Sequence, residues 1–118
     1  MSTIIKTAFI AGVLLFSLSS SLLAESKTSH IIELELNRSY GNFAFIKTDN
    51  HRFGKASCST HEYWDYTLPL ITEFDKATYV TLLTALVESK EVIVLGDGSH
   101  CYEFGSVESL KSVRLKNK

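Results

Sequence analysis

The chain has 118 residues, of which 45% are hydrophobic and 21% are charged, and its formal net charge at pH 7 is −1. That length is sufficient for one small domain but not for two. A net charge so close to zero argues against a nucleic-acid partner, because proteins that bind nucleic acids present a broad basic surface to the phosphates.

The N-terminal segment, residues 1–24, has an apolar centre, with Lys6 near its start and small residues before Ala24. It predicts a secretory signal peptide, because its strongest apolar run is too short for a membrane span and already contains a glycine and a serine. The mature domain would then be residues 25–118, secreted or periplasmic, with no membrane span. Its net charge would be −2, because the signal peptide removes one lysine and no acidic residue.

The first two predicted strands form a hairpin. Residues 25–29 are polar and expected to be flexible, whereas apolar and acidic residues alternate over 30–37. This alternation predicts a strand with one buried face, and residues 43–48 are predicted to return as its antiparallel partner. The side chains expected to face inward are Ile32, Leu34 and Leu36, and those expected to face outward are Glu33 and Glu35.

A third strand is predicted at residues 61–70, after a loop over 49–60. Trp64, Tyr66 and Leu68 alternate along this segment, so we expect them on its core-facing side. The density of aromatic residues here is the highest in the chain and is typical of a strand.

One helix is predicted, over residues 72–90. Thr72 can cap its first turn, and Asp75, three residues later, completes a capping-box pattern. The apolar face that we expect to pack on the sheet consists of Ala77, Tyr79, Val80, Leu82, Leu83, Leu86 and Val87.

A narrow and mostly uncharged stripe also runs along this helix. It consists of Thr78, Thr81, Thr84 and Glu88. The stripe is either an ordinary solvated face or a surface that faces copies of the same chain, since small hydroxyl side chains permit close approach across a symmetry axis.

After the helix, the pattern predicts a strand at residues 91–95, a hairpin turn at 96–99, a returning strand at 100–104 and a short last strand at 113–116. The order is therefore β-β-β-α-β-β plus a short last strand. A mainly β single domain of this order, with one helix after the third strand, predicts a small OB-type barrel. The alternative is an open antiparallel sheet with the helix across one face.

Two cysteines, Cys58 and Cys101, remain in the exported chain, and an oxidising compartment favours a single disulfide between them. A zinc site that adds His61 and His100 is disfavoured, because His100 and Cys101 are neighbours on a predicted strand and would point to opposite faces. A cysteine nucleophile is disfavoured because a bridged thiol cannot react.

No other residues predict catalysis. Asp97, Ser99 and His100 are the residue types of a serine triad, but they are nearly consecutive in a turn and cannot align as nucleophile, base and orienting group. Glu33 and Glu35 share one strand face, as acid and base catalysis requires, but an exposed strand face carries the same residues. We therefore assign no catalytic residue, cofactor or metal.

The exposed aromatic residues are the best candidates for binding. Tyr63 and, second, Tyr40 would stack on the apolar faces of sugars while nearby polar side chains bind the hydroxyl groups. The alternative is that they are ordinary surface aromatics without a ligand.

Several segments together resemble a known family. They are the export signal and, within about residues 29–115, the segments "SHIIELEL", "CSTHEYWDYTLPL", "ATYVTLLTALVESKEVIVLGDGSHC" and the closing "SVRL". The chain is similar to the small secreted bacterial proteins related to the B subunit of subtilase cytotoxin, within the pertussis-like toxins.

This resemblance implies an OB fold, a homo-pentameric ring whose helices line a central pore, and sialylated or other glycans bound on the outer face. A threonine stripe would suit such a pore. Ser29 stands where a serine of the toxin subunits helps to hold the sugar, whereas Lys47 stands where the family has a carboxylate.

We therefore expect a secreted, non-enzymatic, toxin-related protein that binds cell-surface carbohydrate and forms a homo-oligomer. The glycan-binding candidates are Ser29, Tyr40, Lys47 and Tyr63. The alternative is a monomeric periplasmic protein-interaction or inhibitor module that uses the barrel face or the loop at 48–60 against another secreted protein.

Overall fold

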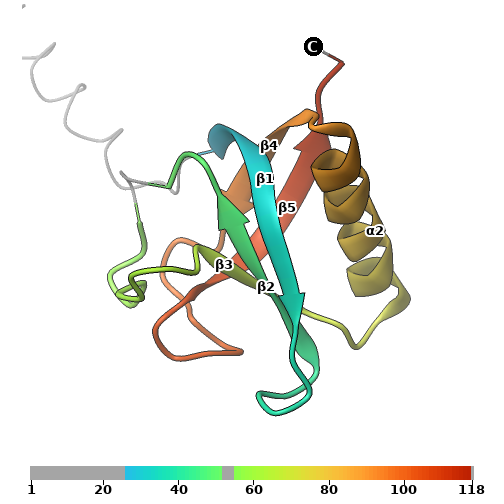
Figure 1. The fold of residues 1–118 in the computed structure, drawn as a ribbon. Helices are drawn as coiled ribbons and strands as arrows, with labels where there is room; N and C mark the ends of the chain where they lie inside the picture. The colour runs from blue at the N-terminus through green and yellow to red at the C-terminus, as the bar shows by residue number, and fades with distance from the viewer. Residues whose placement is uncertain (1–25, 52–54, 118) are drawn as a thin grey trace, which may run out of the picture.

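The structure is a computed structural model that describes residues 26–51 and 55–117. The elements of these residues, labelled in Figure 1, are β1 (Ser26–Leu36), β2 (Phe43–Thr48), β3 (Tyr66–Pro69), α2 (Glu73–Glu88), β4 (Glu91–Gly96) and β5 (Glu108–Leu115). The predicted signal peptide, residues 1–24, lies outside the described part of the chain. Among the described residues, no helix is both long enough and apolar enough to cross a membrane.

The five strands form one mixed sheet that closes in a ring. Their order is β1-β2-β3-β5-β4, and β4 pairs back onto β1. The β3–β5 pair is parallel, and the other pairs are antiparallel. The prediction of a small, mainly β domain with one helix between the third and fourth strands is thus confirmed.

Strand β1 is longer than predicted and serves two neighbours. Residues 26–30, most of which were expected to be flexible, pair with β4, and residues 31–36 pair with β2. A bulge between Ile31 and Glu33 shifts the register and therefore the alternation of side chains. Ile31 is buried and Leu34 packs against the core, but Ile32 and Leu36 are exposed, contrary to the prediction.

Strand β2 has the predicted bounds, whereas β3 is shorter than predicted. Residues 61–65 are not part of the strand, because the Nδ1 atom of His61 accepts hydrogen bonds from the backbone N–H groups of Tyr63 and Trp64 and folds the segment into a turn. Tyr66 is buried in the core as expected. Trp64 instead packs outside the ring.

The second predicted hairpin is also different. Residues 97–107 form a loop, and residues 100–104 are not a strand; the Glu103 carboxylate there accepts hydrogen bonds from the side chains of Thr67 and Ser109, at 2.8 and 3.0 Å. The partner of β4 is β5, which contains most of the short strand predicted at 113–116 but begins several residues earlier. The predicted fifth and sixth strands are therefore replaced by one.

Cys58 and Cys101 form the predicted disulfide. It joins the loop before β3 to the loop before β5, and the backbone N–H groups of Thr60 and His61 both donate to the carbonyl of Ser106. Such a bond is typical of proteins from an oxidising compartment.

The predicted start of α2 is confirmed. Thr72 is the N-cap, its hydroxyl accepts a hydrogen bond from the N–H of Asp75, and the Asp75 carboxylate accepts one from Thr72, which completes the capping box. The helix ends at Glu88, and the C-cap residue Ser89 adopts a left-handed conformation with φ of 52°.

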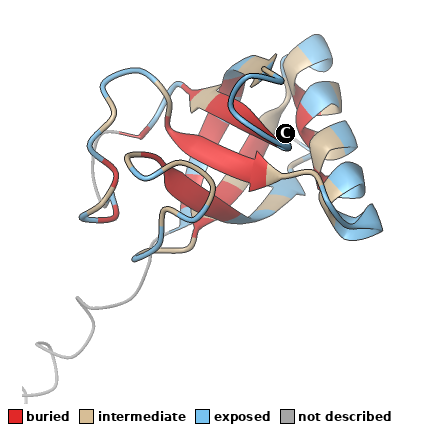
Figure 2. Ribbon diagram, turned by 90° about the horizontal axis from the view of Figure 1, so that it is seen from below, coloured by how far each residue is buried: buried red, intermediate tan, exposed pale blue. Residues whose placement is uncertain are grey.

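The helix packs on the sheet through only part of the predicted apolar face, because Tyr79, Leu82 and Leu86 contact the core as expected and the other members do not. Its buried residues are Thr78, Leu82 and Ala85. Val80 and Val87, expected against the sheet, point outward, and Figure 2 shows this outer side of α2 as exposed. Two of the three buried side chains are small, so the helix can approach the strands closely while Leu82 enters the core.

The described residues form two hydrophobic clusters. The larger fills the ring beneath α2 and includes Ile46, Tyr66, Leu68, Leu82, Val92, Val94 and Leu110. The smaller lies on the outer side of β2 and contains Phe43, Phe45 and Val107, with Trp64 and Phe104 packed against it. This outer cluster anchors the segment before β3 through Trp64.

Candidate functional site

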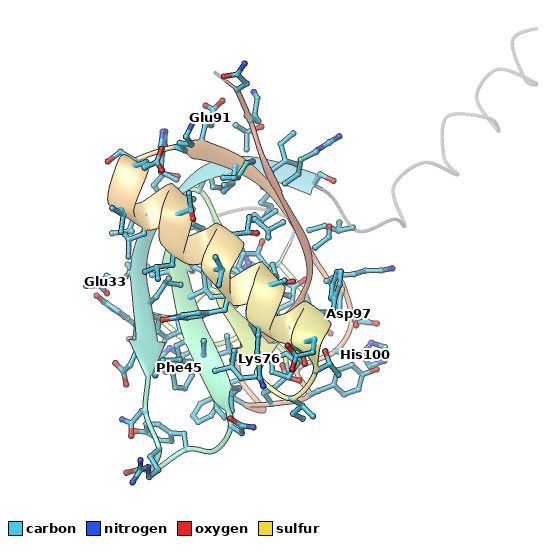
Figure 3. The ribbon with its side chains drawn as sticks, turned by 90° about the vertical axis from the view of Figure 1, so that its right-hand side faces the viewer. Glu33, Phe45, Lys76, Glu91, Asp97 and His100 are labelled. Carbon is cyan, nitrogen blue, oxygen red and sulfur yellow. A yellow bond between two sulfur atoms is a disulfide. The ribbon has the colours of Figure 1, made fainter. Side chains whose placement is uncertain are left out.

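The outer faces of β1 and β2 bring opposite charges together. In the register of these strands, Glu33 lies opposite Lys47 and Glu35 lies opposite Phe45. The bulge in β1 precedes this stretch and directs Glu33 away from the core; Figure 3 shows it projecting from the edge of the molecule. One side of the ring therefore carries two carboxylates next to an ammonium group.

Two aromatic side chains stand beside these charges. Trp64 stacks on Phe45, with ring centroids 5.2 Å apart and an interplanar angle of 22°. Tyr63 meets Trp64 edge to face at 5.0 Å. The backbone of both is held by the turn around His61, so the local chain positions the pair before any ligand binds.

Polar contacts fix Tyr63 further. The Lys47 ammonium lies 4.4 Å from the centroid of the Tyr63 ring and donates a hydrogen bond of 3.1 Å to the Tyr63 carbonyl. The Tyr63 hydroxyl donates to the Glu33 carboxylate. This hydrogen bond raises the pKa of the Tyr63 hydroxyl, because it favours the protonated phenol.

These residues border an open groove of about 510 Å³, which we call the Tyr63–Trp64 groove. Its lining consists of Ile32, Glu33, Leu34, Glu35, Tyr63, Trp64 and Leu86. Apolar and aromatic walls with a few acidic groups are suited to a small ligand that has both apolar faces and hydrogen-bond donors.

The structure brings together only some of the predicted glycan-binding residues. Lys47 and Tyr63 are in contact, and Tyr40, 54% exposed, packs edge to face on Phe45 at 5.6 Å, within the same aromatic cluster. Ser29 does not join them, because it lies within β1 and is only 2% exposed. A serine buried in this way cannot contact a sugar at the surface. Trp64 lines the groove although the strand pattern predicted it in the core, and in its own segment only Tyr63 was predicted to bind a ligand.

The threonine stripe of α2 does not form one outward surface. Thr78 is buried against the body of the protein. The hydroxyl groups of Thr78, Thr81 and Thr84 each donate to the backbone carbonyl four residues earlier, at 2.9 to 3.0 Å. Glu88, the fourth predicted member, is exposed. The hydroxyl groups are therefore occupied within the helix.

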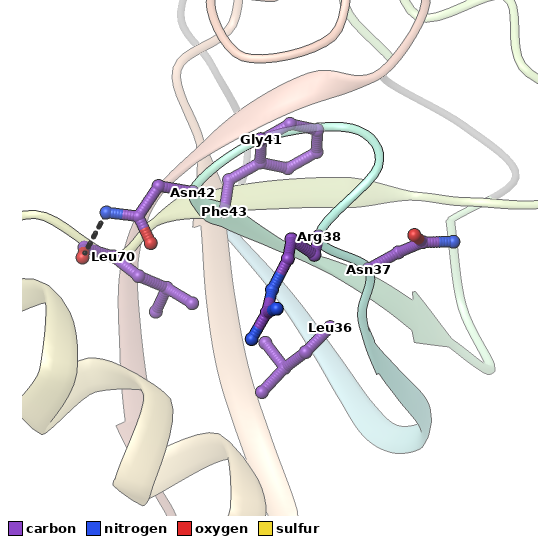
Figure 4. Close-up of a pocket in the computed structure, with 7 residues that line it drawn as sticks. All are labelled: Leu36, Asn37, Arg38, Gly41, Asn42, Phe43 and Leu70. Carbon is purple, nitrogen blue, oxygen red and sulfur yellow. Dashed lines mark hydrogen bonds between the residues drawn. The ribbon is translucent and has the colours of Figure 1, made fainter.

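A second open pocket, of about 450 Å³, lies at the turn between β1 and β2. Figure 4 shows the residues that line it, among them Arg38 and Leu36, and the hydrogen bond of 3.0 Å from the Asn42 side chain to the carbonyl of Leu70. Its aromatic lining is limited to Phe43, so it offers a weaker stacking surface than the Tyr63–Trp64 groove.

A buried charged cluster was not foreseen from the sequence. His51 is 7% exposed, with its Nδ1 atom 3.2 Å from an oxygen of Asp65 and its Nε2 atom 3.6 Å from an oxygen of Glu108. Its ring also packs on Tyr66, with centroids 4.5 Å apart. These partners come from segments far apart in the sequence, so no local motif indicates the cluster.

The members of this cluster shift one another's pKa values. Burial lowers the pKa of His51, but the carboxylates of Asp65 and Glu108 outweigh that effect and hold it above its usual value. Burial also raises the pKa of both acids, yet His51 and backbone N–H groups outweigh it and hold both values below their usual range. The cluster is therefore most stable with His51 protonated and both acids ionised.

The residues that resemble a serine triad do not have its geometry. The Ser99 hydroxyl and an Asp97 oxygen both lie near the same ring nitrogen of His100, Nδ1, at 3.1 and 2.8 Å. Figure 3 shows Asp97 and His100 side by side at the surface. A triad requires one partner on each nitrogen of the histidine, so this arrangement cannot relay a proton from serine. Because Cys58 and Cys101 are bonded to each other, neither thiol is available to bind zinc with His61 and His100.

No protein-family model, no curated protein and no solved structure matches the chain. The function is therefore inferred from the geometry of the Tyr63–Trp64 groove and from the charges around it.

Proposed function

We propose that this protein is a secreted, non-enzymatic glycan-binding protein and that the Tyr63–Trp64 groove holds the sugar. The observation that carries the proposal is the pairing of two supported aromatic rings with two carboxylates along one open groove. The C–H faces of a hexose pack well on aromatic rings, while its hydroxyl groups donate hydrogen bonds to carboxylates.

The charges of the groove favour a neutral sugar. Glu33 and Glu35 contribute two negative charges to the lining, and Lys47 contributes one positive charge beside them. A sialic acid carboxylate would meet net negative charge there, whereas a neutral galactose-type or glucose-type residue would not. The proposed ligand is therefore a neutral cell-surface glycan.

We also propose that the closed ring is an OB-type barrel and that the chain is a relative of the B-subunit-like proteins of the subtilase cytotoxin. The strand order, the five strands and the position of α2 between β3 and β4 support this assignment. Within that family the sugar would contact a serine at the position of Ser29. The burial of Ser29 argues for a different position of the sugar here.

The disulfide and the predicted signal peptide support export, either to the periplasm or to the medium. Export is also what a protein that recognises cell-surface sugars requires.

The chain has one tryptophan, and it lines the groove, so its fluorescence reports on binding directly. The oxidised protein would be titrated with neutral galactosylated and glucosylated oligosaccharides and with a sialylated one. We expect a saturable change in Trp64 fluorescence with a neutral ligand and a much smaller one with the sialylated ligand.

Two variants make the titration specific. Tyr63→Ala should abolish the response, whereas Tyr102→Ala should leave it intact, because Tyr102 is 67% exposed, stacks on His100 and lies outside the groove. No response of the folded protein to any glycan of a broad array would exclude the proposal. An equal loss in both variants would exclude the groove as the site.

One observation favours the alternative function, a protein-interaction or inhibitor module. The outward side of α2 carries exposed apolar residues, among them Val80 and Val87. Exposed apolar surface of this kind is typical of protein-binding faces. A protein that binds no glycan but purifies with a stoichiometric protein partner would support this alternative.

A further inference from the structure

The turn that carries Tyr63 and Trp64 depends on one atom of His61. The Nδ1 atom of its ring accepts hydrogen bonds from the backbone N–H groups of Tyr63, at 3.1 Å, and of Trp64, at 3.0 Å. A ring nitrogen accepts a hydrogen bond only when it carries no hydrogen, so this pattern assigns a neutral His61 with its hydrogen on Nε2. The residue is half-buried, and solvent can therefore protonate it.

Protonation of His61 removes this acceptor. Both ring nitrogens of the imidazolium ion carry hydrogen, so no rotation of the ring restores an acceptor, and an Nδ1–H group would point at two backbone N–H groups. Histidine is the side chain that ordinarily changes charge near physiological pH. The turn therefore contains a group whose protonation breaks the two hydrogen bonds that shape it.

The surroundings of the His61 ring contain no partner for a positive charge. The ring lies edge to face with Phe104, with centroids 6.1 Å apart, and the adjacent acidic residue in the chain, Glu62, is exposed. The described residues form seven ion pairs, and His61 belongs to none of them. A protonated His61 thus loses its acceptor role and gains no ion pair in exchange.

We propose that His61 is a pH-sensitive positioning residue of the Tyr63–Trp64 groove, which binds its ligand when His61 is neutral and releases it when His61 is protonated. This inference rests on the proposed function, since it concerns the affinity for the ligand held in that groove. A neutral sugar has no group that titrates in this range, so a change of affinity with pH originates in the protein.

The effect of protonation is confined to a short segment. The backbone N–H of His61 donates to the carbonyl of Ser106, and that of Asp65 donates to the carbonyl of Ile46, both at 2.9 Å. Neither bond involves the His61 ring, so the chain stays attached on both sides of residues 62–64. Acidification therefore loosens the two aromatic residues without unfolding the domain.

The buried His51 gives the opposite response. Its ring nitrogens lie 3.2 Å from an oxygen of Asp65 and 3.6 Å from an oxygen of Glu108. Acidification gives this ring a charge that both carboxylates stabilise, which tightens the chain directly after Trp64. Loosening of Trp64 on acidification would therefore distinguish His61 from His51 as the responding group.

The test follows Trp64 fluorescence in the oxidised protein between pH 8 and pH 5.5, which is above the range in which exposed carboxylates become protonated. Quenching by acrylamide, measured without ligand, reports how exposed Trp64 becomes. Titration with the neutral galactosylated and glucosylated oligosaccharides at each pH gives the dissociation constant. From pH 7.5 to 5.5 we expect quenching to increase and the dissociation constant to rise about tenfold, the effect of losing one or two hydrogen bonds.

The variant His61→Asn separates the hydrogen bonds from the titration. The Oδ1 atom of asparagine is bonded to Cγ, as Nδ1 of histidine is, and asparagine accepts hydrogen bonds from the backbone two residues later without changing its charge. This variant should bind as the wild type does at pH 7.5 and should not respond to pH. His61→Ala has no acceptor and should show strong quenching and weak binding at every pH.

His100→Asn is the matched control, because His100 is exposed and lies outside the groove, and it should keep the wild-type pH profile. Far-UV circular dichroism at each pH shows whether the proteins are folded. A pH response that persists in His61→Asn would overturn the proposal, since another group would then cause it.

A wild-type protein whose quenching and affinity are both constant between pH 7.5 and 5.5 would also overturn the role of His61, while glycan binding itself would stand. The quenching experiment needs no ligand. It therefore tests the His61 turn even in a protein that binds no glycan, and the two proposals can fail separately.

Discussion

Removal of the disulfide should destabilise the whole domain and loosen the proposed binding site first. The change is the double substitution Cys58→Ser/Cys101→Ser, which leaves no unpaired thiol. The bond closes a loop of 43 residues, and in the chain-entropy model its loss lowers the free energy of unfolding by about 4 kcal/mol. A domain of this size has a total stability of roughly 5–14 kcal/mol, so the loss is a large fraction of it.

The expected fall in melting temperature is about 15–30 °C, because 1 kcal/mol corresponds to roughly 4–8 °C in a domain of fewer than 100 residues. The melt would be followed by far-UV circular dichroism for the strands and by Trp64 fluorescence for the groove. The disulfide connects the loop that carries Trp64 to the loop around Ser106, so the fluorescence transition should precede the circular dichroism transition in the variant.

Reduction provides the control for this measurement. A reductant should lower the melting temperature of the wild-type protein to that of the double variant and should leave the variant unchanged. A fall of less than about 4 °C, equivalent to 1 kcal/mol, would refute the loop-closure argument for this protein.

The remaining predictions concern the buried histidine and the orientation of α2. Because the pKa of His51 is raised in the folded protein, its contribution to stability is present below about pH 6.5 and should be lost as the pH rises through the folded pKa. His51→Gln should lower the free energy of unfolding by about 3 kcal/mol at pH 5.5 and should remove most of this pH dependence. Urea titrations at several pH values would measure both effects. The lowered pKa values of Asp65 and Glu108 give the opposite trend at low pH, where stability should fall as these acids become protonated. A flat wild-type profile between pH 5.5 and 8 would contradict the charged arrangement. Leu82→Ala should lower the free energy of unfolding by about 2–5 kcal/mol, because Leu82 is fully buried. Val87→Ala, at an exposed position, should lower it by less than about 0.5 kcal/mol. Equal losses in the two variants would mean that Val87 also packs on the sheet.

Features that depend on neighbouring residues or on bond chemistry could be predicted from the sequence. The helix start at Thr72 could be predicted because the capping box needs only one other residue, Asp75, three positions later. The strand at 43–48 could be predicted because a local turn sequence directly precedes it. The disulfide followed from the predicted export and from the presence of two cysteines. Each of these signals lies within a few residues or in the composition.

Features set by contacts between distant segments could not be predicted. The bulge after Ile31 arises because β1 must pair with β4 over its first half and with β2 over its second, and it leaves Ile32 exposed. The cluster around His51 depends on Asp65 and Glu108, which are far apart in the sequence and come together only in the folded protein. A local pattern contains no information on such pairings.

The orientation of α2 shows why periodicity alone was insufficient. Periodicity assigned seven apolar residues to one wide face, but only Tyr79, Leu82 and Leu86 of that set pack on the core. Packing follows a different criterion, because a helix placed close to a sheet needs small side chains at the contact, and Thr78 and Ala85 meet that need. Leu82 enters the core between these two small residues, and Val80, Leu83 and Val87 are left exposed on the outer side of the helix.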